Sequence, residues 1–134
     1  MPLTNQPVDV VREAYACFER RDIPALLQLV DDNVDWQAPG PTQEMSWAGG
    51  YHGRDQVRQF FDSLERSLDF LEFSPDQFVQ QGDTVVVLGH ERDRVKATGK
   101  TYEVAWAHCF EVKDGKIARF HDYQDTAAIQ AAFH

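Results

Sequence analysis

An aspartate and a histidine near the C-terminus are the side chains of this sequence best suited to exchange protons near neutral pH. They lie in a stretch that reads TYEVAWAHCFEV, KDGK and IARFHDYQD over residues 101–125, which predicts two β-strands joined by an Asp-Gly connection. His108 belongs to the first strand and Asp122 to the second. Their chemistry depends on whether both side chains lie on the same face of this hairpin.

The pairing register of the hairpin decides this, because a slip of one residue moves every side chain to the other face. A two-residue turn at Asp114 and Gly115 would pair Val112 with Ile117. A type I turn followed by Gly115 as a left-handed bulge residue would pair Val112 with Lys116 instead. Only the second register places the histidine and the aspartate on one face.

We predict the second register, because it gathers the large aromatic side chains of both strands on one face, as a half-buried antiparallel pair requires. In this register His108 lies opposite Phe120, and Asp122 lies opposite Trp106. The imidazole and the carboxylate are then diagonal neighbours, roughly 7 Å apart at Cβ, and both can reach one small molecule. The residues of this face are Trp106, His108, Phe110, Val112, Ala118, Phe120 and Asp122.

Two roles are open for this pair. As an acid and a base, Asp122 would have its pKa raised by burial and lowered by an imidazolium nearby. As a structural pair, the two side chains would only tie the strands together, and such pairs also have shifted pKa values. Cys109 points to the other face, so a Cys–His nucleophile is not expected.

Composition limits the class of protein. The chain has 134 residues, enough for one domain with a sizeable core, and we expect a single domain over 1–134. Its formal net charge of −9 is spread along the chain, which argues against nucleic acid and membranes as partners. Two isolated cysteines favour a reducing compartment, and no signal-peptide pattern or membrane-length apolar run is present, so a cytoplasmic protein is expected.

The hydrophobic spacing predicts the elements that must position the hairpin, in an α+β order. Asn5 and Pro7 are start signals for the first helix, Asp22 and Asp125 are helix caps, and Ser74-Pro75 interrupts a strand. The expected elements are helices over 8–21, from 22 to about 31–33, over 53–68 and over 126–133, strands over 34–38, 71–81 and 84–92, a loop over 39–53, and the hairpin. On the strand over 84–92, the pattern assigns the face of His90 neither to a pocket nor to an interface.

Aromatic side chains outside the hairpin are candidates for the wall of a pocket. Tyr15 lies on the inward stripe of the first helix, where it is either plain core or directs its hydroxyl into a pocket, and Trp36 is core or pocket wall. A Trp on a loop, such as Trp47, either anchors the loop or lines an opening. The predicted substrate-binding set is Trp36, Trp47, Tyr51, Phe60, Trp106, Phe110, Phe120 and Tyr15.

Five segments carry a resemblance to a known family. They are Asp31-Asp32-Asn33-Val34-Asp35-Trp36, Gly50-Tyr51-His52-Gly53, Gly82-Asp83 before a Val-rich strand, Trp106-Ala107-His108, and Asp114-Gly115-Lys116-Ile117. Together with the order of elements, they resemble the SnoaL-like polyketide cyclase branch of the nuclear-transport-factor-two-like (NTF2-like) superfamily, which also contains ketosteroid isomerases, limonene epoxide hydrolases and scytalone dehydratases. The resemblance implies an α+β fold: a cone-shaped, curved antiparallel sheet wrapped around N-terminal helices, an NTF2-like α+β barrel.

The resemblance also implies where chemistry would occur. SnoaL-like cyclases use a carboxylate on the last long strand as acid and base, with a histidine on the preceding strand, and Asp122 and His108 match these positions. Tyr15 loosely matches a first-helix tyrosine that some isomerases use. Epoxide hydrolysis in the superfamily needs an arginine between two acids, and Arg119 is expected on the face opposite Asp122.

The expected function is therefore acid/base proton transfer beside a carbonyl group of a small apolar molecule, in an isomerisation, cyclisation or dehydration without cofactor or metal. The alternative is a non-catalytic protein that binds a small apolar ligand in the same cone. The convex face of the sheet, with Ala105, Ala107, Cys109, Ile117 and Tyr123, is expected to form a homodimer.

Overall fold

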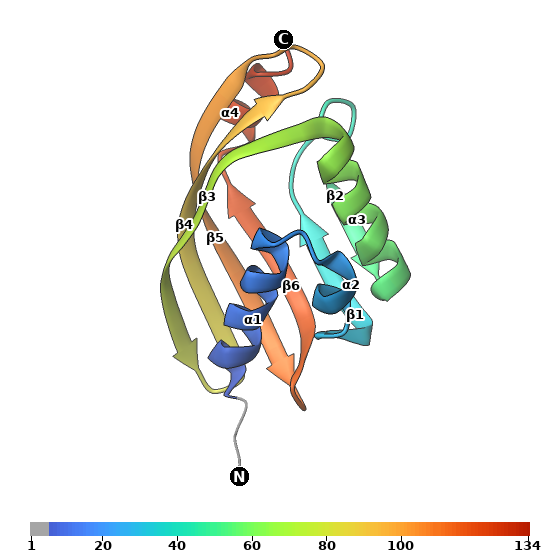
Figure 1. The fold of residues 1–134 in the computed structure, drawn as a ribbon, viewed down its shortest axis with the longest axis vertical. Coiled ribbons are helices and arrows are strands. Elements are labelled where there is room, and N and C mark those ends of the chain that lie inside the picture. The colour runs from blue at the N-terminus through green and yellow to red at the C-terminus, as the bar shows by residue number, and fades with distance from the viewer. Residues whose placement is uncertain (1–5) are drawn as a thin grey trace.

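A six-stranded, strongly curved sheet carries helices on its concave side in the computed structural model, which describes residues 6–134 (Figure 1). The predicted start signal Asn5 lies outside these residues. The elements are α1 (Pro7–Glu19), α2 (Ile23–Leu27), β1 (Val30–Ala38), β2 (Gly49–His52), α3 (Arg54–Ser67), β3 (Leu68–Gln81), β4 (Thr84–Val95), β5 (Thr101–Lys113), β6 (Lys116–Gln124) and α4 (Thr126–Ala131). Figure 1 shows α1 across the concave face of β5 and β6, α2 between α1 and α3, and α3 beside β1 and β2. Among the described residues, no helix has the length and apolarity to cross a membrane.

The strand order is β2-β1-β6-β5-β4-β3, and it corrects two expectations. β1 and β6 run parallel, so the sheet is mixed and not fully antiparallel. Most of the chain separates these two strands, so no hairpin forces them to run in opposite directions. The sheet also stays open, with β2 and β3 at its two edges, so the cone is not a closed barrel.

The predicted helices are confirmed, with different ends. Asp22 caps α2 by accepting a hydrogen bond from the Ala25 amide, and Asp125 caps α4 through the Ala128 amide. The second helix ends earlier than expected, because Val30 already pairs with Ile117 of β6. Residues 30–33, predicted as helix end, belong instead to β1.

Two strand predictions need correction. The loop over 39–53 contains β2, which pairs with β1 with Tyr51 opposite Trp36. The four residues of β2 read Gly-Gly-Tyr-His, so their residue types show no alternation of apolar and polar side chains that would predict a strand. β3 continues through Ser74-Pro75, because it is an edge strand and an edge tolerates a proline with a local irregularity, here between Pro75 and Gln77.

The turn of the β5–β6 hairpin is the two-residue type, so the predicted turn is wrong. Asp114 and Gly115 both adopt left-handed backbone angles, φ 53° and 76°. Val112 therefore pairs with Ile117, not with Lys116. Ile117 is fully buried and lines the interior, so its predicted place on the convex face is also wrong.

A bulge restores the predicted faces further along the hairpin. Between Glu111 and Val112 the register shifts by one residue, which leaves Ala118 without a partner. Beyond this bulge His108 lies directly opposite Asp122, and Phe110 opposite Phe120. The predicted diagonal pairing is wrong, but the predicted shared face is correct for the histidine, the aspartate and their aromatic neighbours.

Candidate active site

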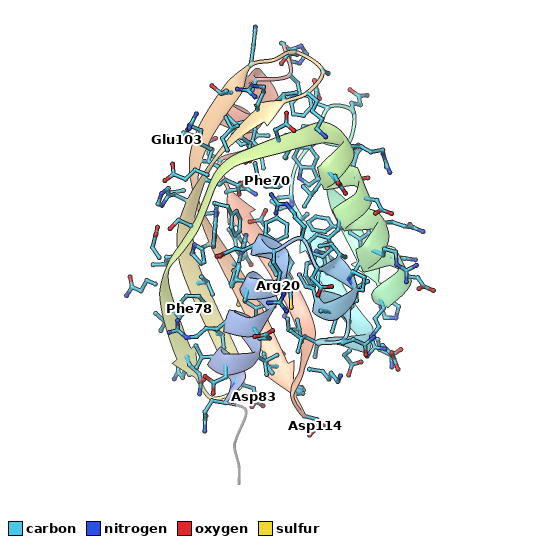
Figure 2. The ribbon with its side chains drawn as sticks, in the orientation of Figure 1. Arg20, Phe70, Phe78, Asp83, Glu103 and Asp114 are labelled. Carbon is cyan, nitrogen blue, oxygen red and sulfur yellow. The ribbon has the colours of Figure 1, made fainter. Side chains whose placement is uncertain are left out.

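A largely aromatic cavity of about 90 Å³ lies between the helices and the concave face of the sheet. Figure 2 shows the side chains that fill this space, with Phe70 facing the helices and Glu103 on the outer side. The lining includes six of the predicted substrate-binding residues, Tyr15, Trp36, Trp47, Phe60, Phe110 and Phe120, together with His108 and Asp122. A cavity of this kind, mostly apolar with a few polar groups, is typical of a binding site for a small molecule.

Tyr51 and Trp106 are the two predicted substrate-binding residues that do not line the cavity. The Tyr51 hydroxyl donates a hydrogen bond of 2.7 Å to the Trp47 carbonyl, and its ring packs on Phe60. Tyr51 therefore holds the loop that carries Trp47. Trp106 lies against the ring of His108 on the sheet and supports it.

Three buried side chains lie in a line at the cavity wall. The Tyr15 hydroxyl is hydrogen bonded to Nδ1 of His108 at 2.7 Å. Nε2 of the same imidazole lies 3.1 Å from Oδ1 of Asp122, an oxygen that receives no hydrogen bond of normal geometry from the described residues. Residue exposures are only 7% for Tyr15, 8% for His108 and 6% for Asp122. Water screens this line weakly, so each charge in it acts strongly on the others.

The line accommodates two protonation states of His108. With a neutral imidazole, the Tyr15 hydroxyl donates to Nδ1 and the remaining proton sits on Nε2, facing Asp122. With an imidazolium, Nδ1 donates to the Tyr15 hydroxyl and the N–H at Nε2 faces the Asp122 carboxylate. Burial, and then the negative charges of Asp122 and Glu91, raise the pKa of Tyr15, so its hydroxyl keeps its proton.

The indole of Trp106 fixes the plane of the imidazole. The two rings stack with centroids 3.9 Å apart and an angle of 11° between their planes. The indole reaches this position because Gly89 on the neighbouring strand has no side chain. A Cβ at Gly89 would lie 2.4 Å from the Trp106 ring and 2.4 Å from the Ser74 carbonyl oxygen. Gly89 thus gives the space that Trp106 needs under His108.

Gln124, which was not predicted as a site residue, touches the candidate acid. Its Nε2 donates a short hydrogen bond to Oδ2 of Asp122. Its own Oε1 is buried, and it has no hydrogen-bond partner among the residues that the structure describes. A signal was present in the sequence, because Gln124 follows Asp122 by two residues on the same strand and so shares its face.

A second group that was not predicted is acidic and lies on the inner face of β4. Glu91 is 6% exposed, Asp93 is fully buried, and Tyr102 of β5 pairs with Asp93. Glu91 and Tyr102 line the cavity. The alternation that buries Val85 and Val87 continues to residues 91 and 93, and this continuation was the available signal.

Both carboxyl groups favour the protonated form. Burial raises the pKa of Glu91 well above its ordinary value, and the neighbouring Asp93 and then Asp122 add to the rise. Burial also raises the pKa of Asp93, which Glu91, Tyr102 and the positive charge of Arg21 partly oppose. Neither Asp93 oxygen receives a hydrogen bond of normal geometry from residues 6–134.

Other polar residues lie outside the cavity. Arg119 is exposed and pairs with Glu111 at 3.4 Å, which places it on the convex face, away from Asp122. His90 also lies outside, where it contacts Asp76 and Glu72. In the part of the chain that the structure describes, no group of three or more His, Cys, Asp or Glu side chains is arranged to hold a metal ion.

The fold and this site define an NTF2-like α+β protein, and comparison with known proteins agrees. Residues 11–120 match the SnoaL-like domain family, and the chain belongs to this family.

Solved structures agree with this assignment. An NTF2-like protein from Burkholderia thailandensis shares 27% identity and a TM-score of 0.89, with 98% of this chain and 99% of that chain covered. One from Burkholderia xenovorans shares 27% identity and a TM-score of 0.87, with 96% and 95% covered. TerC, co-crystallised with polyporic acid, shares 26% identity and a TM-score of 0.84, with 95% and 97% covered. No protein of curated function matches the sequence.

Proposed function

We propose that this protein is an enzyme that moves a proton beside a carbonyl group of a small, largely apolar molecule, without a cofactor. The observation that carries this proposal is the buried line of Tyr15, His108 and Asp122 at the wall of an aromatic cavity. An acidic C–H group needs a base within hydrogen-bond reach and a donor where negative charge develops on oxygen. Asp122 and His108 offer these two groups side by side.

In the proposed reaction, the Asp122 carboxylate takes a proton from the carbon beside the carbonyl. The electron pair of the broken C–H bond moves to the carbonyl oxygen, and an N–H of His108 stabilises the charge there. Asp122 or His108 then returns a proton to a carbon of the enolate, which completes an isomerisation or starts a cyclisation or a dehydration. Tyr15, by bonding to Nδ1, keeps Nε2 directed toward the acid.

Gln124 orients the base in this scheme. A carboxylate has about four lone-pair positions, so Asp122 can accept from Gln124 and contact His108 with acceptor capacity left for a proton. The apolar wall excludes water, which strengthens each of these interactions. General acid–base help of this kind contributes about 10²–10⁴ in rate.

The rival proposal is a protein that binds an apolar molecule in the same cavity without changing it. TerC, a similar protein, was co-crystallised with polyporic acid, which supports a ligand-binding role for this cavity under either proposal. The two proposals differ in one measurable property. Only an enzyme accelerates the exchange with solvent of the hydrogen beside the carbonyl of a bound ketone.

The test is the uptake of solvent deuterium by a panel of small aromatic ketones in D₂O, followed by NMR. We expect the wild-type protein to accelerate exchange and Asp122→Asn to lower the rate by about 10²–10⁴, because the amide cannot take the proton. Asp76→Asn, which changes a carboxylate beside a histidine on the outer face, is the matched control and should exchange at the wild-type rate. Binding without exchange in the wild-type protein would favour the non-catalytic alternative.

We also propose a homodimer formed through the convex face. Leu88 and Tyr123 are 43% and 53% exposed there, large values for apolar side chains. Ala107 lies half-buried between them in the sheet, and Cys109 lies half-buried on the same face of β5. Sedimentation of the wild-type protein and of Tyr123→Asp tests this proposal. A monomeric wild-type protein would contradict it.

A further inference from the structure

The cavity has a second polar end, which the proposed reaction does not use. Glu91 lies on β4 opposite Val104, whereas Asp122 lies on β6 opposite His108. The two acids are therefore four residues apart along β5 and two strands apart, roughly 13 Å and 10 Å at the backbone. Both side chains line the same cavity, so one ring-sized molecule can lie between them.

Two carboxyl groups lie at this second end. Glu91 shares its surroundings with Asp93, and in residues 6–134 no arginine or lysine forms an ion pair with either carboxyl group. Two adjacent buried carboxyl groups hold at least one proton between them. When Glu91 donates this proton to Asp93, its other oxygen is left as an acceptor, as it also would be in the ionised state.

A second observation supports a ligand that carries a hydrogen-bond donor. Gln124 lines the cavity and pairs with Trp106, so it lies between the positions of Asp122 and Glu91 along β5. Its Oε1 is buried and has no partner within the described residues. A buried acceptor without a donor costs free energy unless a bound group satisfies it. The missing partner of Gln124 is thus a hydrogen-bond donor on the side of the cavity toward Glu91.

The other end of the cavity offers donors. Trp36 lines the cavity, and its Nε1 is buried without a partner in the described chain. Trp36 pairs with Phe120, so it is a near neighbour of Asp122 on the adjacent strand. Together with the Nε2 of His108, this N–H group can bind a carbonyl oxygen. Donors thus lie beside the acid and base, and the Glu91 carboxyl offers an acceptor on another part of the same cavity wall.

We propose that Glu91 is a second substrate-binding residue, which accepts a hydrogen bond from a hydroxyl group of the bound molecule. The inference rests on the proposed function and narrows its substrate class to neutral hydroxylated ketones, with the carbonyl at His108 and the hydroxyl at Glu91. An anionic ligand is disfavoured, because Glu91, Asp93 and Asp122 all face or adjoin the cavity. A group that only tied β4 to β5 would not need to face a cavity.

Matched pairs of ketones test this proposal by calorimetry. They are 4′-hydroxyacetophenone against 4′-fluoroacetophenone, and 2-acetyl-6-hydroxynaphthalene against its 6-fluoro analogue. Fluorine occupies nearly the volume of a hydroxyl group but donates no hydrogen bond. We expect the wild-type protein to bind the hydroxylated member of at least one pair roughly tenfold more tightly, the effect of one hydrogen bond in a dry site. Equal affinities within both pairs, or no binding of any hydroxylated ketone, would overturn the proposal.

Two variants assign the preference to the side chain. Glu91→Gln keeps the preference for the hydroxylated ketone, because its amide can donate to Asp93 and present a carbonyl oxygen to the cavity. Glu91→Leu abolishes the preference. If the leucine variant does not fold, Glu91→Met is used in its place. A preference that survives in the apolar variant overturns the proposal.

Two further measurements distinguish a ligand-binding Glu91 from a structural one, and hydroxyl recognition from catalysis. A purely structural Glu91 predicts a Glu91→Leu variant that keeps the ligand preference, whereas our proposal predicts a folded variant that has lost it. Thermal unfolding shows whether the variant is folded; its stability falls under either role, because Asp93 loses the proton that Glu91 donates. Asp122→Asn should retain the preference while losing deuterium exchange. If the wild-type protein accelerates deuterium exchange but shows no preference for the hydroxylated ketone, only the inference about Glu91 is wrong. If it shows the preference but no accelerated exchange, only the catalytic proposal is wrong.

Discussion

Two histidine–carboxylate groups lie on opposite faces of the same sheet. On the concave face, His108 Nε2 lies 3.1 Å from Asp122 Oδ1, with side-chain exposures of 10% and 8%. On the convex face, His90 Nδ1 lies 2.7 Å from Asp76 Oδ2, with exposures of 41% and 47%. The functional groups are the same, and the outer pair is even the closer one. What differs is the surroundings of each pair.

Aromatic rings surround the inner pair, His108 and Asp122, whereas solvent and flexible side chains surround the outer pair, His90 and Asp76. His108 stacks on Trp106 and bonds to Tyr15, so its ring has one position and one chemical neighbour on each nitrogen. His90 instead contacts two exposed acids, Asp76 and Glu72. Solvent screens charges at such a surface and makes exposed ion pairs worth little. Proton transfer to a bound molecule is therefore a property of the concave face, although both faces contain the required groups.

Removal of each histidine in turn should produce the largest contrast. We expect His108→Ala to lower the rate of deuterium exchange by about 10²–10⁴, because the enolate oxygen loses its donor. His90→Ala should leave the rate unchanged, because this imidazole does not reach the cavity. The NMR exchange assay with the best ketone of the panel measures both. Equal losses in the two variants would show that the position of the histidine in the sheet does not matter.

The support beneath the inner pair gives the next largest effect. Gly89→Ala adds a methyl group 2.4 Å from the Trp106 ring and from the Ser74 carbonyl oxygen, so the indole and the strand must both move. Overpacking of this kind costs about 1–3 kcal/mol in unfolding free energy. We also expect slower exchange, because His108 loses the surface on which it stacks. Chemical denaturation and the exchange assay measure the two effects.

Gly50→Ala is the matched control for this substitution. There the added Cβ would meet only the end of the Gln37 side chain, at 3.1 Å, and this flexible group can move aside. We expect a change in unfolding free energy of no more than about 0.5 kcal/mol. If both alanine variants were equally stable, the close approach of Trp106 to β4 would not be important for the site.

The concave site was predictable where it depends on alternation. His108, Phe110, Phe120 and Asp122 were placed on one face because side chains alternate along a strand, and this was correct. The turn was not predictable from residue types alone, since Asp114-Gly115 suits both turn geometries considered. The bulge at Val112 compensated for the wrong turn, so the faces were correct although the pairing was not.

The missed features have a different physical cause. Glu91 and Asp93 were overlooked because acidic residues are rarely buried, and composition therefore suggests a solvated strand end. β2 and the parallel β1–β6 pair depend on contacts between distant residues, which leave no local pattern in the sequence. Local alternation thus identified one acid of the cavity. The alternation from Val85 and Val87 also extends to the second acid, but its residue type argued against burial.

A substitution in the outer pair should have the smallest effect, a change in the titration of His90 alone. Hydrogen bonds with Asp76 and then Glu72 raise the pKa of His90 above its ordinary 6.5. The stability that this pair contributes is therefore fully present below pH 6.5, where the histidine is also protonated in the unfolded chain, and it is lost as the pH rises through the pKa of His90 in the folded protein.

We expect Asp76→Asn to lower the pKa of His90, measured by NMR of its ring protons, with little change in overall stability, because the pair is exposed to solvent. The deuterium exchange rate at the concave site should not change. A change in that rate would show that the two faces of the sheet are coupled, and the contrast between them would then not be one of burial alone.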